Sequence, residues 1–187
     1  MEETMKNYFI VSAVGKDRPG LVADVSEVIY EFGGNIEDSR MTQLRNYFSI
    51  LILFSTERQG VIENLSQGFK RLKDQKAIDV FYSPITIEEA YRKAQESVNR
   101  FKISTSGVDH AGIVFKICRL LANKGINIEN METHCHPSAE SGTPVFEMDM
   151  EIEVPSSISE MTLRDDLHLI ANELVIDLVL KRVKKED

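Results

Sequence analysis

The chain has 187 residues, of which 42% are hydrophobic, and a formal net charge of −8. The acidic balance argues against direct nucleic-acid binding, which needs a basic surface. No apolar run is long enough to span a membrane. The N-terminal residues MEETMKNYF lack the basic start and the apolar stretch of a signal peptide, so we expect a cytosolic protein with no membrane association.

The first half of the chain predicts four strands and two helices. Alternating or continuous apolar residues predict strands over 8–14, 35–44, 47–55 and 78–83, with Arg45-Asn46 as a hairpin turn. A helix is expected to begin at Pro19, because proline suits the first helical position, and to end at Gly33-Gly34. Its apolar face comprises Leu21, Val22, Val25, Val28, Ile29 and Phe32. A second helix is expected over about 60–74.

The stretch 15–37, GKDRPGLVADVSEVIYEFGGNIE, recurs at 107–129 as GVDHAGIVFKICRLLANKGINIE, at a constant offset of 92 residues. Glycines and polar residues stay in register over the whole length, which indicates an internal repeat. The second half then predicts strands over 99–106, 127–136, 145–154 and 175–182, and helices over about 111–124 and 162–173.

Each half therefore has the order βαββαβ, which is typical of a ferredoxin-like sandwich. We expect an α+β protein of two tandem sandwiches, each an antiparallel four-stranded sheet with two helices on one face. The domains are placed at residues 1–84 and 98–187, with a linker over 85–97 that begins where Pro84 interrupts the strand ladder.

The third strands of the two halves differ in their hydrophobic pattern. YFSILILF at 47–54 is apolar at nearly every position, so both of its faces are expected to be buried and the first sheet to be covered by another chain or domain. In 145–154, Phe146, Met148, Met150 and Ile152 alternate with acidic residues, so this strand is expected to bury one face only.

The pattern of Gly15, Asp17-Arg18-Pro19-Gly20-Leu21-Val22, a helix and then Asn35-Ile36 resembles the ACT domain, a small regulatory module that binds amino acids. Both halves carry it, although Arg18-Pro19 is replaced by His110-Ala111 in the second. The resemblance implies that sites form where the turn and the asparagine face a neighbouring domain. It points to Asp17, Arg18, Gly20, Leu21 and Asn35, and to their counterparts Asp109, His110, Gly112, Ile113 and Asn127.

The turn has chemistry that suits an amino acid. A helix N-terminus offers free N–H groups and partial positive charge, so the backbone of Gly20 and Leu21 could hold a carboxylate. Asp17 could accept a hydrogen bond from the ammonium group, and Asn35 can both donate and accept. A purely structural interpretation stays open: Gly20 and Gly112 could serve helix–sheet packing, and Asp17 and Asn35 could satisfy backbone ends.

His134, Cys135 and His136, with Glu132 on the same strand face as the histidines, raise the question of a metal site. An exposed polar strand end is the simpler interpretation, and no metal or cofactor is predicted. His110 has no nucleophile or orienting partner in the sequence pattern, so catalysis is not predicted either.

The sequence thus favours a non-enzymatic regulatory protein that binds a small amino acid, such as glycine, at ACT domain interfaces. It would form a homodimer and act on transcription or metabolism through a protein partner such as a transcription factor. The alternative is a constitutive protein-interaction module without a ligand.

Overall fold

A computed structural model describes residues 6–58, 60–91 and 98–183. The chain divides into two compact units, Met1–Lys93 and Ala94–Asp187, each described here by itself. In the predicted linker over 85–97, the structure shows a short helix, α3 (Ile87–Ala90). It begins with a capping box formed by Thr86 and Glu89. Residues 92–97 of that linker lie outside the described residues.

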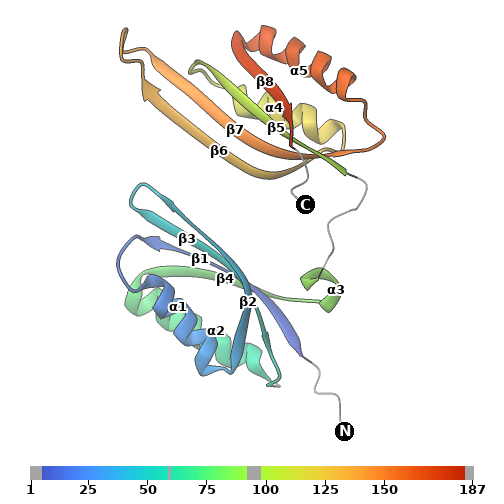
Figure 1. The fold of residues 1–187 in the computed structure, drawn as a ribbon. Helices are drawn as coiled ribbons and strands as arrows, with labels where there is room; N and C mark the ends of the chain where they lie inside the picture. The colour runs from blue at the N-terminus through green and yellow to red at the C-terminus, as the bar shows by residue number, and fades with distance from the viewer. Residues whose placement is uncertain (1–5, 59, 92–97, 184–187) are drawn as a thin grey trace. The chain divides into compact units, whose positions relative to one another are not determined.

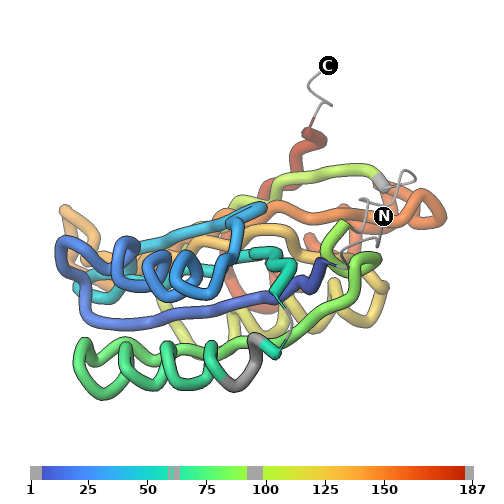
Figure 2. The backbone as a smooth tube through the Cα atoms, turned by 90° about the horizontal axis from the view of Figure 1, so that it is seen from below, coloured from blue at the N-terminus to red at the C-terminus, as the bar shows by residue number. Residues whose placement is uncertain are grey.

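The first unit is a four-stranded antiparallel sheet with two helices on one face (Figure 1). Its elements are β1 (Asn7–Lys16), α1 (Leu21–Glu31), β2 (Gly34–Leu44), β3 (Tyr47–Thr56), α2 (Val61–Lys76) and β4 (Ile78–Ile85). The strand order is β2-β3-β1-β4, so the first and third strands are central. Figure 2 shows α1 and α2 running alongside each other over the sheet.

The second unit repeats this topology, with strand order β6-β7-β5-β8. Its elements are β5 (Val98–Val108), α4 (Ile113–Asn123), β6 (Asn127–Pro137), β7 (Pro144–Pro155), α5 (Glu160–Leu174) and β8 (Ile176–Arg182). The predicted fold of two tandem ferredoxin-like sandwiches is therefore confirmed. No helix within the described ranges is long and apolar enough to cross a bilayer.

Each unit has its own core between the sheet and its helices. In the first, alternate residues of β1 (Phe9, Val11 and Ala13) and of β3 pack against the apolar stripe of α1. Phe9 stacks on Phe54 at 5.2 Å between ring centroids. Of the six residues predicted on the apolar side of α1, Val22 is the exception, because 45% of its surface is exposed. In β7 the predicted alternation is confirmed: Phe146, Met148, Met150 and Ile152 are buried, and Glu147, Asp149 and Glu151 are exposed.

Two local predictions are wrong. Helix α1 begins at Leu21 with Gly20 as its N-cap, so Pro19 precedes the helix. Pro84 lies within β4, opposite Phe9. Strand β4 is an edge strand, and an edge position tolerates a residue that lacks an N–H. Strand β3 buries one face against its own helices, whereas Leu51 on the other face is 47% exposed in this single chain. That another chain or domain covers this second face stays a prediction.

Candidate ligand-binding site

The turn between β1 and α1 is held by backbone and side-chain contacts at Asp17. Its N–H donates to the carbonyl oxygen of Asn46 in the β2–β3 hairpin at 2.9 Å. The Gln43 side chain donates from Nε2 to Asp17 Oδ2 at 2.5 Å. One carboxylate oxygen is thereby occupied, and Oδ1 is the atom left to meet an ammonium group.

Helix α1 starts without a side-chain cap. Gly20 is its N-cap at φ 92°, a left-handed conformation that glycine adopts without steric cost. Among the residues that the structure describes, no side chain caps this helix start. Apart from the Arg18 guanidinium, no atom outside the adjoining residues lies within 4 Å of a Cβ built on Gly20. A small carboxylate could therefore approach these amides, where the helix dipole favours negative charge. Leu21 contributes only its backbone here, because its side chain is buried in the core.

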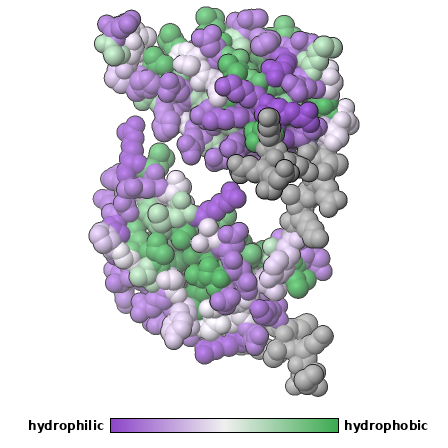
Figure 3. Space-filling model, in the orientation of Figure 1, coloured by the Kyte–Doolittle hydropathy of each residue, from purple (hydrophilic) through white to green (hydrophobic). Residues whose placement is uncertain are grey.

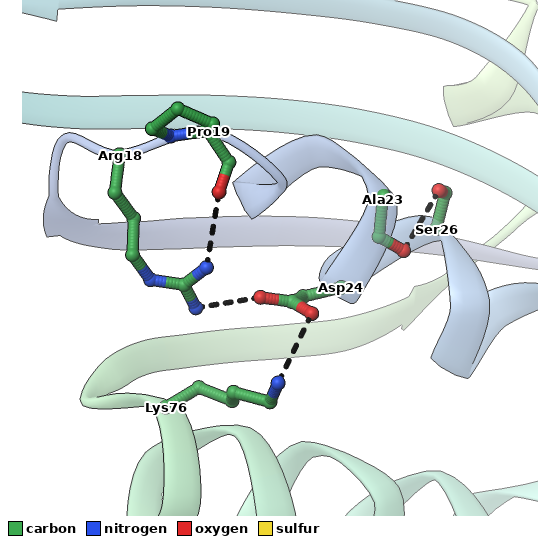
Figure 4. Close-up of polar contacts among 6 residues, drawn as sticks. All are labelled: Arg18, Pro19, Ala23, Asp24, Ser26 and Lys76. Carbon is green, nitrogen blue, oxygen red and sulfur yellow. Dashed lines mark hydrogen bonds and ion pairs between the residues drawn. The ribbon is translucent and has the colours of Figure 1, made fainter.

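Arg18 folds back onto the helix that follows it (Figure 4). Its Nη2 donates to Asp24 Oδ2 at 2.6 Å, and its Nη1 donates to the Pro19 carbonyl oxygen at 3.3 Å. Lys76, at the end of α2, lies 3.5 Å from the other Asp24 oxygen. The hydrogen bond from Arg18, with a smaller contribution from Lys76, lowers the pKa of Asp24. The Arg18 guanidinium, which was predicted to contact a ligand, is therefore already paired with the Asp24 carboxylate.

Asn35 lies at the opposite end of the unit from this turn. It pairs with Ser55 on β3, and Ser55 pairs with Tyr8 near the start of β1, whereas Asp17 follows Lys16 at the end of β1. Eight residues of strand separate the two ends, which is about 26 Å at roughly 3.3 Å per residue. Within one unit, the structure brings Asp17, Arg18, Gly20 and Leu21 together but does not bring Asn35 to them.

An open groove of about 590 Å³ runs between α1 and the start of β2. The groove is lined by Asn35 and by Asp24, the partner of Arg18. The other lining residues include Ala23, Ser26, Glu27 and Tyr30. The groove therefore connects the vicinity of the turn with the asparagine along the outside of α1.

The second turn repeats the first with different side chains. Asp109 N–H donates to the Pro144 carbonyl oxygen at 2.9 Å, and Cys135 Sγ donates to Asp109 Oδ2 at 3.3 Å. Gly112 is the N-cap of α4 at φ 104°, again without a side-chain cap, and Ile113 is buried. Asn127 again lies at the far end, where its Nδ2 donates to Glu153 at 3.5 Å.

His110 takes the place of Arg18 and ties the second turn to the end of α5. Its Nε2 lies 2.8 Å from the Leu174 carbonyl oxygen and its Nδ1 lies 3.2 Å from that of Ala111. A neutral imidazole can donate through one nitrogen only, whereas the imidazolium donates through both. The Leu174 carbonyl, and then that of Ala111, accordingly raise the pKa of His110. Lys116, equivalent to Asp24, pairs with Glu173 at 2.6 Å across the same junction.

Sequence reasoning did not single out Gln43 and Cys135, although each contacts the turn aspartate of its own unit. The two residues are related by the same offset of 92 that relates Asp17 to Asp109. Extending the repeat comparison to the ends of the second strands would have identified them. The Asp109 hydrogen bond, with some burial, raises the pKa of Cys135, which disfavours a reactive thiolate there.

His134 and Glu132 line a shallow cavity of about 350 Å³ on the open face of the second sheet, with Glu147, Asp149 and Asp177. The register places Glu132 opposite Asp149 and His134 opposite Glu147. Asp149 is engaged by Ser104 Oγ at 2.6 Å and Lys102 Nζ at 3.2 Å. Among the residues that the structure describes, no three His, Cys, Asp or Glu side chains are arranged to hold a metal ion.

The two units, each with a helix that starts at a glycine N-cap after a short turn, define a protein of the α+β sandwich class. The sequence profile of the ACT domain matches residues 7–83. A UPF0237 protein of Methanopyrus kandleri is 32% identical over 84 residues, which are 44% of this chain and 90% of that protein. The chain belongs to the ACT-domain family.

Further relatives and structures extend this result. The glycine cleavage system transcriptional repressor of Escherichia coli is 36% identical over 55 residues, 29% of each chain. An unknown protein from Galdieria sulphuraria has the same fold, with a TM-score of 0.79 at 23% identity over 96% of this chain and all of the other. A putative glycine cleavage system transcriptional repressor matches with a TM-score of 0.72 at 19% identity, over 97% and 99% of the two chains.

Proposed function

We propose that this ACT-domain protein is a non-enzymatic regulator that binds a small amino acid, with glycine as the first candidate. The observation that carries the proposal is the start of α1 at Gly20, which no described side chain caps, beside the Asp17 carboxylate, of which only Oδ2 is engaged by a described residue. The glycine assignment draws on the name of the Escherichia coli relative.

In this proposal, the ligand carboxylate accepts hydrogen bonds from the first-turn amides of α1, and the ligand ammonium donates to Asp17 Oδ1. The absence of a Cβ at Gly20 leaves space for the ligand to approach the backbone. The second turn offers the same elements at Asp109, Gly112 and Ile113, with His110 in place of Arg18.

Asn35 enters the site from a neighbouring domain, because about 26 Å of strand separates it from the turn of its own unit. In the same way, Asn127 would contribute to a site at the second turn from a neighbouring domain. A ligand held between two domains favours one domain arrangement over another, and a protein partner such as a transcription factor reads out that arrangement. The net charge of −8 favours action through a protein rather than through DNA contact.

A thermal-denaturation series with glycine, serine and the other small amino acids tests the proposal. Ligand at 100 times its dissociation constant stabilises a protein by about 2.7 kcal/mol, which gives a clear rise in melting temperature. Asp17→Asn keeps an oxygen for Gln43 and removes the charge that holds the ammonium group, so this variant should lose the shift. Asp38→Asn, which removes a charge from an exposed position on β2, should keep it.

A constitutive interaction module is the second candidate, and the exposed apolar residues on the open face of the first sheet favour it. Melting temperatures that no amino acid changes, in a protein that still associates, would support this alternative.

A further inference from the structure

The ion pair between Arg18 and Asp24 lies at the start of α1, where the proposed function places the carboxylate of an amino acid. Arg18 Nη2 donates to Asp24 Oδ2 at 2.6 Å, and Figure 4 shows the guanidinium pointing toward the first turn of the helix. The other terminal nitrogen, Nη1, lies 3.7 Å from the position that a Cβ on Gly20 would take. The guanidinium is therefore within reach of a carboxylate that binds the first-turn amides.

An internal carboxylate and a ligand carboxylate would compete for this guanidinium. Arginine binds a carboxylate most strongly through two parallel N–H···O bonds. Asp24 makes one such bond, because Nη1 donates instead to the Pro19 carbonyl oxygen at 3.3 Å. The carboxylate of an amino acid at the helix start is the same chemical group as the Asp24 side chain, so it can replace Asp24 as the partner of Arg18.

Lys76 gives Asp24 a second partner, which keeps this exchange from leaving an unpaired charge. Its Nζ lies 3.5 Å from Asp24 Oδ1, the oxygen that Arg18 does not contact. The Asp24 side chain is only 16% exposed, and a largely buried carboxylate without a partner is destabilising. When Arg18 turns to a ligand, Asp24 can remain paired with Lys76.

The pair between Arg18 and Asp24 is also weak enough to open. Hydrophilic side chains make up much of the outer surface of the first unit (Figure 3), and Arg18 belongs to this surface, because its side chain is 38% exposed. Water solvates the guanidinium when such a pair separates, so a partly exposed ion pair favours its closed state by a small factor only. A ligand that brings its own carboxylate can therefore compete with Asp24.

The second turn differs from the first in this respect. His110 takes the place of Arg18, and its ring nitrogens contact carbonyl oxygens rather than a carboxylate. Lys116 takes the place of Asp24 and pairs with Glu173 at 2.6 Å. Within the described residues, a carboxylate that competes with a ligand is therefore a feature of the first turn and not of the second.

We propose that Asp24 competes with the ligand carboxylate for Arg18 and thereby lowers the affinity of the first turn for amino acids, an inference that rests on the proposed function. The ligand binds when Arg18 exchanges Asp24 for the ligand carboxylate, and Asp24 then stays paired with Lys76. The fraction of molecules in which Arg18 is free sets the apparent affinity. Because the pair is partly exposed, removal of the competitor should raise the affinity about three- to tenfold.

Calorimetric titration of the full chain with glycine and serine tests this competition, with Asp24→Asn as the variant that removes it. This variant should bind about three- to tenfold more tightly than the wild type although it is less stable, whereas loss of a purely structural contact would lower stability without raising affinity. In an Arg18→Ala background, Asp24→Asn should leave the affinity unchanged. Lys76→Gln should weaken binding, because Asp24 then depends on Arg18 alone. Glu27→Gln, which removes a charge about one turn further along α1, is the matched control and should change the affinity by less than about twofold.

A titration with acetate separates this inference from the proposed function. Acetate carries a carboxylate but no ammonium group, and the NMR signal of the Arg18 side-chain N–H, assigned by its loss in Arg18→Ala, reports its binding. If no amino acid binds but acetate shifts this signal at lower concentration in Asp24→Asn than in the wild type, the competition stands and the amino-acid assignment fails. Amino-acid binding that is equally tight in both proteins would overturn the competition. Where no amino acid binds, an acetate response that is the same in both proteins would overturn it as well.

Discussion

Replacing Asp24 by asparagine should destabilise the first unit and, at the same time, release Arg18. The carboxylate contacts Arg18 at 2.6 Å and Lys76 at 3.5 Å, and its side chain is only 16% exposed. It also lies in the first turn of α1, where the helix dipole favours a negative charge.

The size of the effect follows from these contacts. The dipole interaction is worth about 0.5 kcal/mol at such a position, and the charge-assisted hydrogen bond about 1 kcal/mol after discounting for the exposure of Arg18. We therefore expect a loss of about 1–2 kcal/mol in the free energy of unfolding. The hydrogen bond from Arg18 lowers the pKa of Asp24 in the folded protein. This stability is therefore fully present above the unfolded pKa of Asp24, near 3.8, and is lost as the pH falls through the lowered folded pKa.

Urea denaturation of the double-mutant cycle of Arg18→Ala and Asp24→Asn measures the pair directly. We expect a coupling free energy of about 0.5–1.5 kcal/mol. Glu173→Gln is the control, because its pair with Lys116 joins the equivalent junction with both side chains well exposed and should cost less than about 0.5 kcal/mol. A coupling indistinguishable from zero, or equal losses at Asp24 and Glu173, would refute the reasoning.

Three more predictions concern the second unit. Gly112→Ala should cost about 1–2 kcal/mol, because φ 104° is unfavourable for a residue with a Cβ; circular-dichroism melting that matches the wild type would contradict this. The raised pKa of His110 means that its hydrogen bond to the Leu174 carbonyl stabilises the protein fully below about pH 6.5 and progressively less as the pH rises through the folded pKa. Urea denaturation at pH 6 and pH 8 should therefore show that the difference in unfolding free energy between wild type and His110→Gln shrinks at pH 8. A difference that stays constant would contradict this. Ile103→Ala should cost about 2–5 kcal/mol, because the side chain is fully buried, whereas Val179→Ala at a half-exposed position should cost well under 1 kcal/mol by the same assay.

The fold could be predicted from the sequence because periodicity and repetition act locally. Alternation in 145–154 indicates which residues of β7 face the core, and the repeat at an offset of 92 gives the second unit the topology of the first. Helix starts were harder to place, because Pro19 and Gly20 both suit one, and only the φ of Gly20 shows that the helix begins after it.

The site was predicted less completely than the fold. The contact between Arg18 and Asp24 depends on the direction in which the chain leaves Gly20, which no pattern of residue types specifies. The separation of Asn35 from the turn follows from the length of α1 and the antiparallel register, and both emerge only when the strands are paired. The apolar pattern of β3 indicates that both of its faces avoid water, but it does not specify whether a domain of this chain or another molecule covers Leu51.

A calorimetric titration of the full chain with glycine, followed by serine and the other small amino acids, tests the central claim most directly. The account predicts saturable binding of at least one of them, lost in Asp17→Asn and in Asn35→Ala and retained in Asp38→Asn. Titrations that release no heat with any of these amino acids, or binding that survives Asp17→Asn unchanged, would contradict it.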